Sequence, residues 1–176
     1  AVVEALCDWV NSGGTFVGVG EPSALPGYHT RFRLAQILGV DADIPAYACH
    51  GKRSAVTESN HPILRSGAAL PAGVWVRLLS PETRVLCSSD ASPALTLHPF
   101  GQGLGIYMAG YRHTATNARF LLNTLLYACG CNAETQPLAE HAAVDCAWFP
   151  ESGTLLAANG SGEALKTIVR FGQEQL

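Results

Sequence analysis

Charged side chains are scarce in this sequence, and lysine is nearly absent. Only 14% of the 176 residues are Asp, Glu, Lys or Arg, and the two lysines are Lys52 and Lys166. A typical soluble domain has about a quarter of its residues charged. Nucleic-acid binding needs clustered Lys and Arg to neutralise phosphates, so this composition and the net charge of −3 argue against it. We expect part of the surface to be covered by other parts of a larger protein, with a further segment before Ala1.

Long apolar runs are absent as well. No run approaches the roughly 20 residues that span a bilayer, and the start lacks the basic segment of a signal peptide. We therefore expect a soluble, cytoplasmic protein without a membrane partner. The cysteines occur singly in apolar segments and form no tight disulfide framework, which favours buried free thiols in a reducing compartment. They are Cys7, Cys49, Cys87, Cys129, Cys131 and Cys146.

No pattern typical of a bound cofactor is present. Cys129 and Cys131, with His141 and Cys146, are the candidate zinc ligands, but the C-x-C start and the uneven spacing fit no standard site. The remaining histidines form no H-E-x-x-H pair. The run from Gly18 to Gly20 lacks the third glycine and the immediate helix of a dinucleotide fingerprint. We predict no metal and no organic cofactor.

The first forty residues alternate between helical and extended patterns. Apolar residues at helical spacing predict a helix from Val2 to Val10, and Thr15 to Val19 is typical of a short buried strand. The loop from Glu21 to Thr30 contains two prolines, and a second helix from about Arg31 to Leu38 is closed by Gly39. This alternation predicts an α/β fold with a mostly parallel sheet and flanking helices.

The rest of the chain is predicted to contain a hairpin, one clear helix and a meander. Residues 41–72 read as loop-rich, including a turn at Asp41 and Asp43. Strands are expected at 74–79 and 84–88, and a glycine hairpin pairs 94–98 with 104–109. Thr114 or Thr116 caps a helix with an apolar stripe, and 142–176 reads as three antiparallel strands. The expected domains are therefore 1–131, a linker at 132–141, and 142–176 as the start of a β-sandwich. The predicted stripe consists of Ala118, Leu121, Leu122, Leu125 and Cys129.

Glu21 occupies the most promising position for a binding site. It directly follows the predicted buried strand 15–19, and open α/β sheets build their sites at the carboxyl ends of strands. The carboxylate of Glu21 is suited to accept sugar hydroxyls, while Ser23 and Arg31 are suited to hold a phosphate or a hydroxyl. Alternatively, Glu21 accepts hydrogen bonds from loop amides and the arginines face solvent. The run 88–90, Ser-Ser-Asp, also ends a strand and is a candidate for the same rim.

Cys49 is the alternative nucleophile. The run Ala48-Cys49-His50-Gly51 resembles the A-x-C-H-G elbow of the DJ-1/PfpI group, in which a thiolate is activated by its turn and by a nearby base. Such an elbow needs a hydrophobic strand before it and a helix after it. The sequence that follows, Lys52-Arg53-Ser54, has no helical stripe. A loop or buried cysteine is the simpler interpretation, and a cysteine hydrolase stays open as the second hypothesis.

Three segments carry a family resemblance. They are GVGEPSA at 18–24, RFRLAQILGVD at 31–41 and YMAGYRHTATNARFLLNTLLYACG at 107–130. Together they resemble the central domain of the lacto-N-biose and galacto-N-biose phosphorylases, also called 1,3-β-galactosyl-N-acetylhexosamine phosphorylases. The chain departs from the family pattern at Arg33 and Gln36 and across residues 46–66.

The resemblance implies a domain order and a reaction. In that family a TIM-barrel-like domain supplies the general acid, a class I glutamine-amidotransferase-like α/β domain follows, and β-sandwich domains close the chain. The implied reaction is reversible, inverting phosphorolysis of a β-galactoside to α-galactose 1-phosphate, with inorganic phosphate as nucleophile and no metal. On this basis the chain holds no catalytic residue and is inactive alone. Its implied partners are the barrel domain, the disaccharide, phosphate and a second copy in a homodimer; a purely structural role is the remaining alternative.

Overall fold

The computed structural model describes the chain as two compact units. Unit 1 comprises Ala1–His61 and Ala69–Arg112, and unit 2 comprises Pro62–Ala68 and His113–Leu176. The domain boundaries expected from the sequence stay a prediction. The residues that the structure describes are 1–22, 24–25, 28–43, 61–66, 70, 73–89, 92–114, 117–131, 137–141, 143–171 and 174–175.

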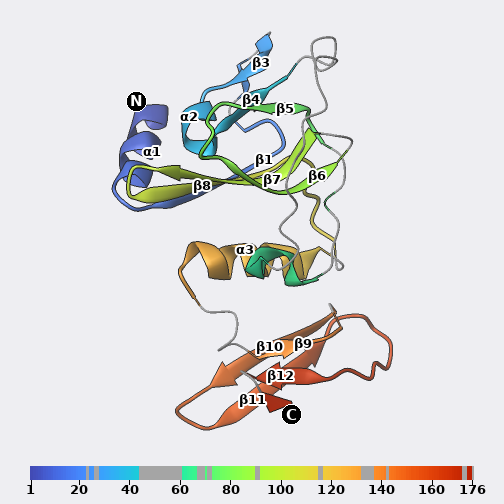
Figure 1. Cartoon of the computed structure of the whole chain (residues 1–176). Helices are drawn as coiled ribbons and strands as arrows, with labels where there is room; N and C mark the ends of the chain where they lie inside the picture. The colour runs from blue at the N-terminus through green and yellow to red at the C-terminus, as the bar shows by residue number, and fades with distance from the viewer. Residues whose placement is uncertain are drawn as a thin grey trace. The chain divides into compact units, whose positions relative to one another are not determined.

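A four-stranded sheet forms the centre of unit 1. Its strand order is β1-β8-β7-β6 (Figure 1). Strand β8 runs parallel to β1 and antiparallel to β7, and β7 runs antiparallel to β6. The expected strand after the first helix and the expected glycine hairpin are both confirmed. The bounds are β1 Thr15–Val19, β6 Arg84–Ser89, β7 Ser92–Phe100 and β8 Gly103–Met108.

One face of this sheet is covered by α2 (Ala35–Leu38). The cross-strand register places Gly18, Gly105 and Tyr107 on that face. A Cβ atom at Gly105 would collide with the backbone carbonyl of Ile37, and one at Gly18 would press on the side chain of Leu38. Glycine is therefore required where α2 lies against the strands. The helix is stopped by Gly39, which has a φ of 65° and donates its N–H to Ala35 O at 2.8 Å, as the sequence predicts.

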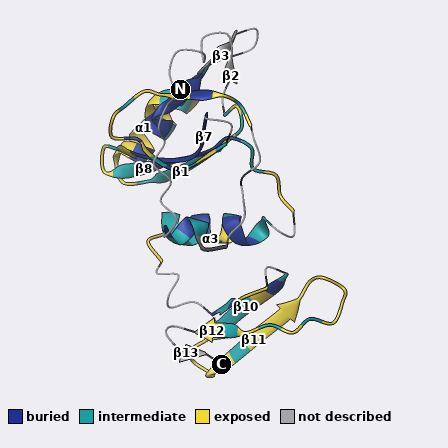
Figure 2. Ribbon diagram, turned by 45° about the vertical axis from the view of Figure 1, so that its right-hand side comes forward, coloured by how far each residue is buried: buried dark blue, intermediate teal, exposed yellow. Residues whose placement is uncertain are grey.

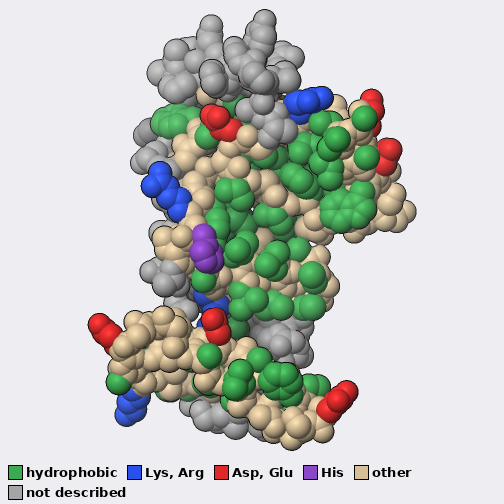
Figure 3. Space-filling view, turned by 180° about the vertical axis from the view of Figure 1, so that it is seen from behind, with side chains coloured by type: hydrophobic (Ala, Val, Ile, Leu, Met, Phe, Trp, Pro, Cys, Tyr) green, Lys and Arg blue, Asp and Glu red, His purple; other side chains and the backbone are tan. Residues whose placement is uncertain are grey.

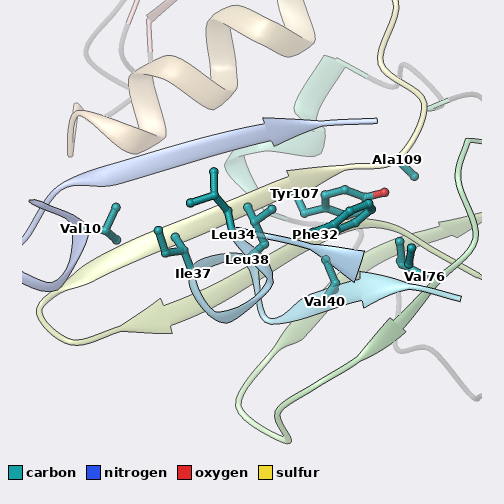
Figure 4. Packing of buried hydrophobic residues seen from close by; sticks show 10 residues of the cluster. Val10, Phe32, Leu34, Ile37, Leu38, Val40, Val76, Tyr107 and Ala109 are labelled. Atoms are coloured by element: carbon teal, nitrogen blue, oxygen red, sulfur yellow. The ribbon is translucent and has the colours of Figure 1, made fainter. Parts of the chain in front are cut away.

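The core of unit 1 lies between α2, the sheet and the end of α1 (Val2–Asn11), as Figure 4 shows. A helix of four residues is not stable by itself. Ile37 and Leu38 are fully buried, and burying a side chain of this size contributes about 1.5–3 kcal/mol. Tertiary packing therefore holds α2 in place. The cluster consists of Val10, Phe32, Leu34, Ile37, Leu38, Val40, Ala42, Val76, Tyr107 and Ala109.

Two short antiparallel ladders complete unit 1. Strand β2 (Ala24–Leu25) pairs with β3 (Tyr28–Phe32), and β4 (Val40–Ala42) pairs with β5 (Val76–Leu78). Asp41 lies in β4 with its carboxylate buried, and Oδ1 accepts the N–H groups of Phe32 and Ala42 at 2.7 and 2.9 Å. This carboxylate joins β3 to β4. The expected turn at Asp41 is thus a strand, because the side chain satisfies backbone donors in an extended segment.

Unit 2 combines two helices with short strands. The 3-10 helix η1 (Pro62–Ser66) packs against α3 (Ala118–Ala128), while β10 (Val144–Phe149) and β11 (Thr154–Asn159) form a hairpin that is largely exposed (Figure 2). The third expected strand of the meander pairs elsewhere. Strand β12 (Val169–Phe171) lies between β9 (Leu138–Ala139) and β13 (Glu174–Gln175) and not beside β11.

The predicted fold class is wrong. Among the described strands only β1 and β8 are parallel, and all other ladders are antiparallel. The helix expected over Arg31–Leu38 begins only at Ala35, because Arg31 and Phe32 belong to β3. A parallel crossover needs a dozen or more residues, usually with a long helix, and α2 is a single turn. The described chain is therefore a mixed, mainly antiparallel β structure with few helices, not a helix-flanked sheet of the glutamine-amidotransferase class.

The helix predicted after Thr114 is confirmed as α3, but its apolar stripe is not its buried face. Leu122 and Leu125 are 38% and 48% exposed. The buried face instead carries Arg119, Phe120 and Asn123, together with Thr124. Arg119 Nη2 donates to Val144 O at 2.8 Å. This face also has helical spacing. The hydrogen bond from Arg119 to β10 offsets only part of the cost of burying polar atoms, because Arg119 Nε and Asn123 Oδ1 are buried without a partner among the described residues.

Charged side chains are few on the surface. On the face shown in Figure 3, Lys, Arg, Asp and Glu are scattered, and apolar side chains gather between them. The exposed large apolar residues of unit 1 include Val2 and Trp9 on α1. None of the helices in the described ranges is both long and apolar enough to cross a membrane.

Candidate functional site

The candidate site lies at the edge of the sheet where β1 and β8 both end. Because these strands are parallel, their carboxyl ends meet there, with Val19 opposite Met108. The chain turns immediately after β1 at Gly20, whose φ of 65° favours glycine. Glu21 follows and is exposed. Pro22 folds back, so that a Cβ atom at Gly18 would lie 3.1 Å from its ring.

The backbone of Gly20 is held from both sides by β8. Its N–H donates to Met108 O at 2.9 Å, and its carbonyl accepts the Tyr107 hydroxyl at 3.0 Å. The Tyr107 ring is fully buried and tilted against Phe32, with 5.9 Å between ring centroids. Two hydrogen bonds to rigid sheet atoms therefore fix the turn that presents Glu21.

The electrostatics of the turn link Glu21 to Tyr107. Burial raises the pKa of the Tyr107 phenol, and the negative charge of Glu21 raises it further. Both effects disfavour the phenolate. Tyr107 is therefore a neutral hydrogen-bond donor at physiological pH. The carboxylate of Glu21 remains the group of this turn that can accept hydrogen bonds from a ligand.

The second candidate for this site, Ser89 of the run 88–90, lies further along the same edge of the sheet. Ser89 lines a crevice of about 10 Å³ with Gly73, Trp75 and Ala109, which is about the space of one water molecule. Ser92 Oγ there accepts the N–H of Val76 at 3.0 Å. Glu21 follows β1 and Ser89 is the last residue of β6, and these are the outer strands of the sheet. They are separated by three strand spacings, or about 14 Å, and do not converge on one small group.

The structure describes only one of the predicted site residues completely. Glu21 lies at the strand end, as the sequence predicts for its position. Ser23 and Cys49 lie outside the described residues, so the phosphate-binding role of Ser23 and the nucleophile alternative stay predictions. Arg31 is placed in the backbone of β3, and its side chain lies outside the described part.

Sequence reasoning missed Tyr107 and the role of Asp41. A tyrosine between Ile106 and Met108 in a buried strand needs a partner for its hydroxyl, and that need was the available signal. For Asp41 the signal was its place in an apolar extended run, Val40-Asp41-Ala42. Asp41 Oδ2 also lies 3.6 Å from Arg77 Nη2. Tyr107 thus fixes the Glu21 turn directly, whereas Asp41 joins β3, β4 and β5.

The thiols differ from the expectation of burial. Cys129 and Cys131 are exposed, and Cys7, Cys87 and Cys146 are partly buried; all five are free. Burial raises the pKa of the Cys87 thiol, and a hydrogen bond with the Leu95 backbone partly offsets this. Among the residues with described placement, no three His, Cys, Asp or Glu side chains converge as metal ligands.

Comparison with solved structures gives a match at the level of the fold. The β-galactosidase from Rahnella sp. R3 superposes with a TM-score of 0.52 and 16% sequence identity, over 98% of this chain and 25% of that one. At 16% sequence identity this likeness shows a shared fold and gives no evidence about activity.

Comparison with known sequences identifies the family. The chain is 35% identical over 168 residues to D-galactosyl-β-1→4-L-rhamnose phosphorylase from Lachnoclostridium phytofermentans, covering 96% of this chain and 23% of that protein. It is 29% identical over 208 residues to 1,3-β-galactosyl-N-acetylhexosamine phosphorylase from Bifidobacterium longum, covering 96% of this chain and 27% of that protein. The chain thus spans about a quarter of the length of these relatives. The model of the lacto-N-biose phosphorylase central domain matches residues 1–133, so the chain belongs to this family of phosphorylase central domains.

Proposed function

We propose that the chain acts as a non-catalytic part of a β-galactoside phosphorylase, in which the Glu21 turn helps to shape the sugar and phosphate site. The observation that carries the proposal is the family match together with the position of Glu21. The carboxylate is exposed at the end of β1, on a turn fixed by Tyr107. A rigid, accessible carboxylate is suited to accept hydroxyl hydrogens of a sugar.

The proposed reaction is reversible phosphorolysis of a β-galactoside to α-galactose 1-phosphate with inversion. The two relatives are named for a β-linked galactosyl group and differ in the second sugar, so the proposal covers β-galactosides as a class. Phosphate arrives already nucleophilic, and a single general acid suffices for the leaving sugar. We assign that acid to a barrel domain in the longer protein. Ser23 and Arg31 are the further groups proposed for phosphate or sugar, and the reaction as proposed uses no metal.

The test is Glu21→Ala in the longer phosphorylase that contains this chain. Loss of one charge-assisted hydrogen bond of about 1.5–3 kcal/mol predicts that kcat/KM for phosphorolysis falls at least about tenfold. The matched control is Glu151→Ala, an exposed glutamate in the turn between β10 and β11, which is expected to leave the kinetics unchanged. Equal kinetics for Glu21→Ala and the unaltered enzyme would refute the role of Glu21.

A structural role in subunit or domain contacts is the second candidate. The observation that favours it is the exposed pair Leu122 and Leu125 on one side of α3, together with the low charge of the surface. This role predicts that Leu122→Ser lowers assembly of the longer protein while the Glu21→Ala enzyme keeps normal kinetics. Size-exclusion chromatography with light scattering measures the assembly.

The cysteine-hydrolase alternative makes a different prediction. If Cys49 were a nucleophile, alkylation would abolish activity and substrate would protect against it. On our proposal the Cys49→Ala enzyme retains normal phosphorolysis. Peptide mapping after alkylation, with and without the disaccharide, decides between the two.

A further inference from the structure

Unit 1 contains a groove that the Glu21 turn does not line. Its volume is about 590 Å³, within the range of about 300–1,000 Å³ that is typical of small-molecule sites. One wall is the face of α1 that carries Glu4 and Asp8, and the other comes from the segment around α2 and from β4 and β5. The polar residues of this second wall are Arg33, Gln36, Asp41 and Arg77.

Asp41 and Arg77 form an ion pair within this second wall. The Asp41 side chain is only 8% exposed, and its Oδ1 is held by two backbone N–H groups. Its Oδ2 lies 3.6 Å from Nη2 of Arg77, whose side chain is 48% exposed. A guanidinium has five N–H donors, so an arginine held from one side by a fixed carboxylate still presents donors to a ligand.

The remaining charges of the groove are separated between its walls. Arg33 and Gln36 are exposed on the wall with Arg77, and Glu4 and Asp8 lie on α1. Since Asp41 offsets Arg77, Arg33 adds positive charge to its wall. On α1, Asp8 and Glu4 each offer a carboxylate, and Oε2 of Glu4 lies 2.8 Å from the Ala1 ammonium. An apolar ligand would desolvate these groups without pairing them. A ligand with one anionic group and several hydroxyl donors matches both walls, because arginines bind phosphate and carboxylates accept hydroxyl hydrogens.

We propose that this groove binds a sugar phosphate, with the phosphate at Arg33 and Arg77 and the sugar hydroxyls at Asp8 and Glu4. The ligand class follows from the walls alone and does not depend on the role proposed for Glu21. Bound there, the ligand links α1 to the β4–β5 ladder. Such a site would let the protein respond to a phosphorylated sugar through a surface separate from the Glu21 turn.

The test is calorimetric titration of the 176-residue chain with glucose 1-phosphate, and with glucose and inorganic phosphate as separate probes. We expect glucose 1-phosphate to bind, Arg33→Ala to weaken it about tenfold or more, and Asp8→Asn to weaken it without changing the weaker binding of inorganic phosphate. Arg170→Ala, at an exposed arginine paired with Glu140 in unit 2, is the matched control and leaves the affinity unchanged. Because Arg33 is exposed, its replacement keeps the unfolding midpoint of the chain.

Three results would overturn the proposal. They are no heat of binding at about 10 mM glucose 1-phosphate, an affinity unaffected by Arg33→Ala, or inorganic phosphate binding as tightly as the sugar phosphate. The groove proposal is read from the effects of Arg33→Ala and Asp8→Asn on this titration. Failure of the groove proposal is therefore distinguishable from failure of the role proposed for Glu21, which is read from phosphorolysis kinetics.

Discussion

Replacing Tyr107 by Phe isolates the hydrogen bond that fixes the Glu21 turn. The substitution keeps the buried ring and its contact with Phe32 but removes the hydroxyl, which donates to Gly20 O at 3.0 Å. A net hydrogen bond contributes about 1 kcal/mol. The Gly20 carbonyl is only partly buried, so water can replace the lost donor in part. We therefore expect the free energy of unfolding to fall by about 1 kcal/mol at neutral pH.

Urea unfolding at equilibrium measures this change. The matched control is Ser152→Ala, which removes an exposed hydroxyl that donates to Phe149 O at 3.4 Å. That change is expected to alter the free energy by less than about 0.5 kcal/mol. If Tyr107→Phe cost no more than Ser152→Ala, the hydroxyl would not hold the turn, and the account of how Glu21 is positioned would be wrong.

The same variant has a predicted pH dependence. The native pKa of Tyr107 lies above its unfolded value of about 10, so above pH 10 the unfolded chain loses the phenolic proton while the native chain keeps it. The contribution of the protonated Tyr107 phenol to the free energy of unfolding is therefore fully present below pH 10, and it falls by up to about 1.4 kcal/mol per pH unit above pH 10. The difference in stability between the unaltered chain and Tyr107→Phe should shrink as the pH rises past 10. A constant difference would refute the assignment of the raised pKa to Tyr107.

The other predictions concern packing, Asp41 and the thiols. Gly105→Ala drives a Cβ into the Ile37 carbonyl and should lower the free energy of unfolding by about 1–3 kcal/mol. In the control Gly160→Ala, the added Cβ meets its nearest atom at 3.6 Å, and the free energy of unfolding should change by under about 0.5 kcal/mol. Chemical denaturation of both variants measures the two changes. Asp41→Ala leaves two backbone donors unpaired and should cost about 1–3 kcal/mol, more than Arg77→Ala at its half-exposed partner; an equal cost would contradict this. Iodoacetamide should modify exposed Cys129 and Cys131 before Cys87, whose raised pKa lowers its thiolate fraction. Peptide mass spectrometry gives the order of modification, and faster modification of Cys87 would contradict this prediction.

The local elements near the N-terminus were predictable because their signals are short-range. The apolar spacing of α1, the β-branched run of β1 and the stop at Gly39 each depend on a few neighbouring residues. The hairpin between β7 and β8 follows from Gly101 and Gly103 between two apolar runs. Each of these elements occurs where the sequence predicts it.

The pairing of strands was not predictable from the same signals. The RFRLAQIL run has helical spacing, yet Arg31 and Phe32 join β3 because the Asp41 carboxylate, nine residues from Phe32, accepts the Phe32 N–H. In α3 the leucines form the more apolar face, but the structure buries the face with Arg119 and Asn123. Contacts distant in sequence decided both outcomes, and local propensity carries no information about them. The inference of a parallel sheet failed for that reason.

For the candidate site, the sequence predicted the position of Glu21 but not what holds it. A polar residue after a buried strand is a local signal, whereas the Tyr107 hydroxyl reaches Gly20 from 87 residues away. The Asp41–Arg77 pair of the groove likewise joins two strands that lie 36 residues apart.

Hydrogen exchange across Val19–Pro22 tests the central claim most directly. The measurement compares the longer phosphorylase with and without its β-galactoside and phosphate, followed by mass spectrometry of the peptide. If the turn contacts the ligands, its amides exchange more slowly when they are bound, while peptides from the β10–β11 hairpin do not change. Unchanged exchange at Val19–Pro22 under saturating ligands would contradict the claim that this turn forms part of the site.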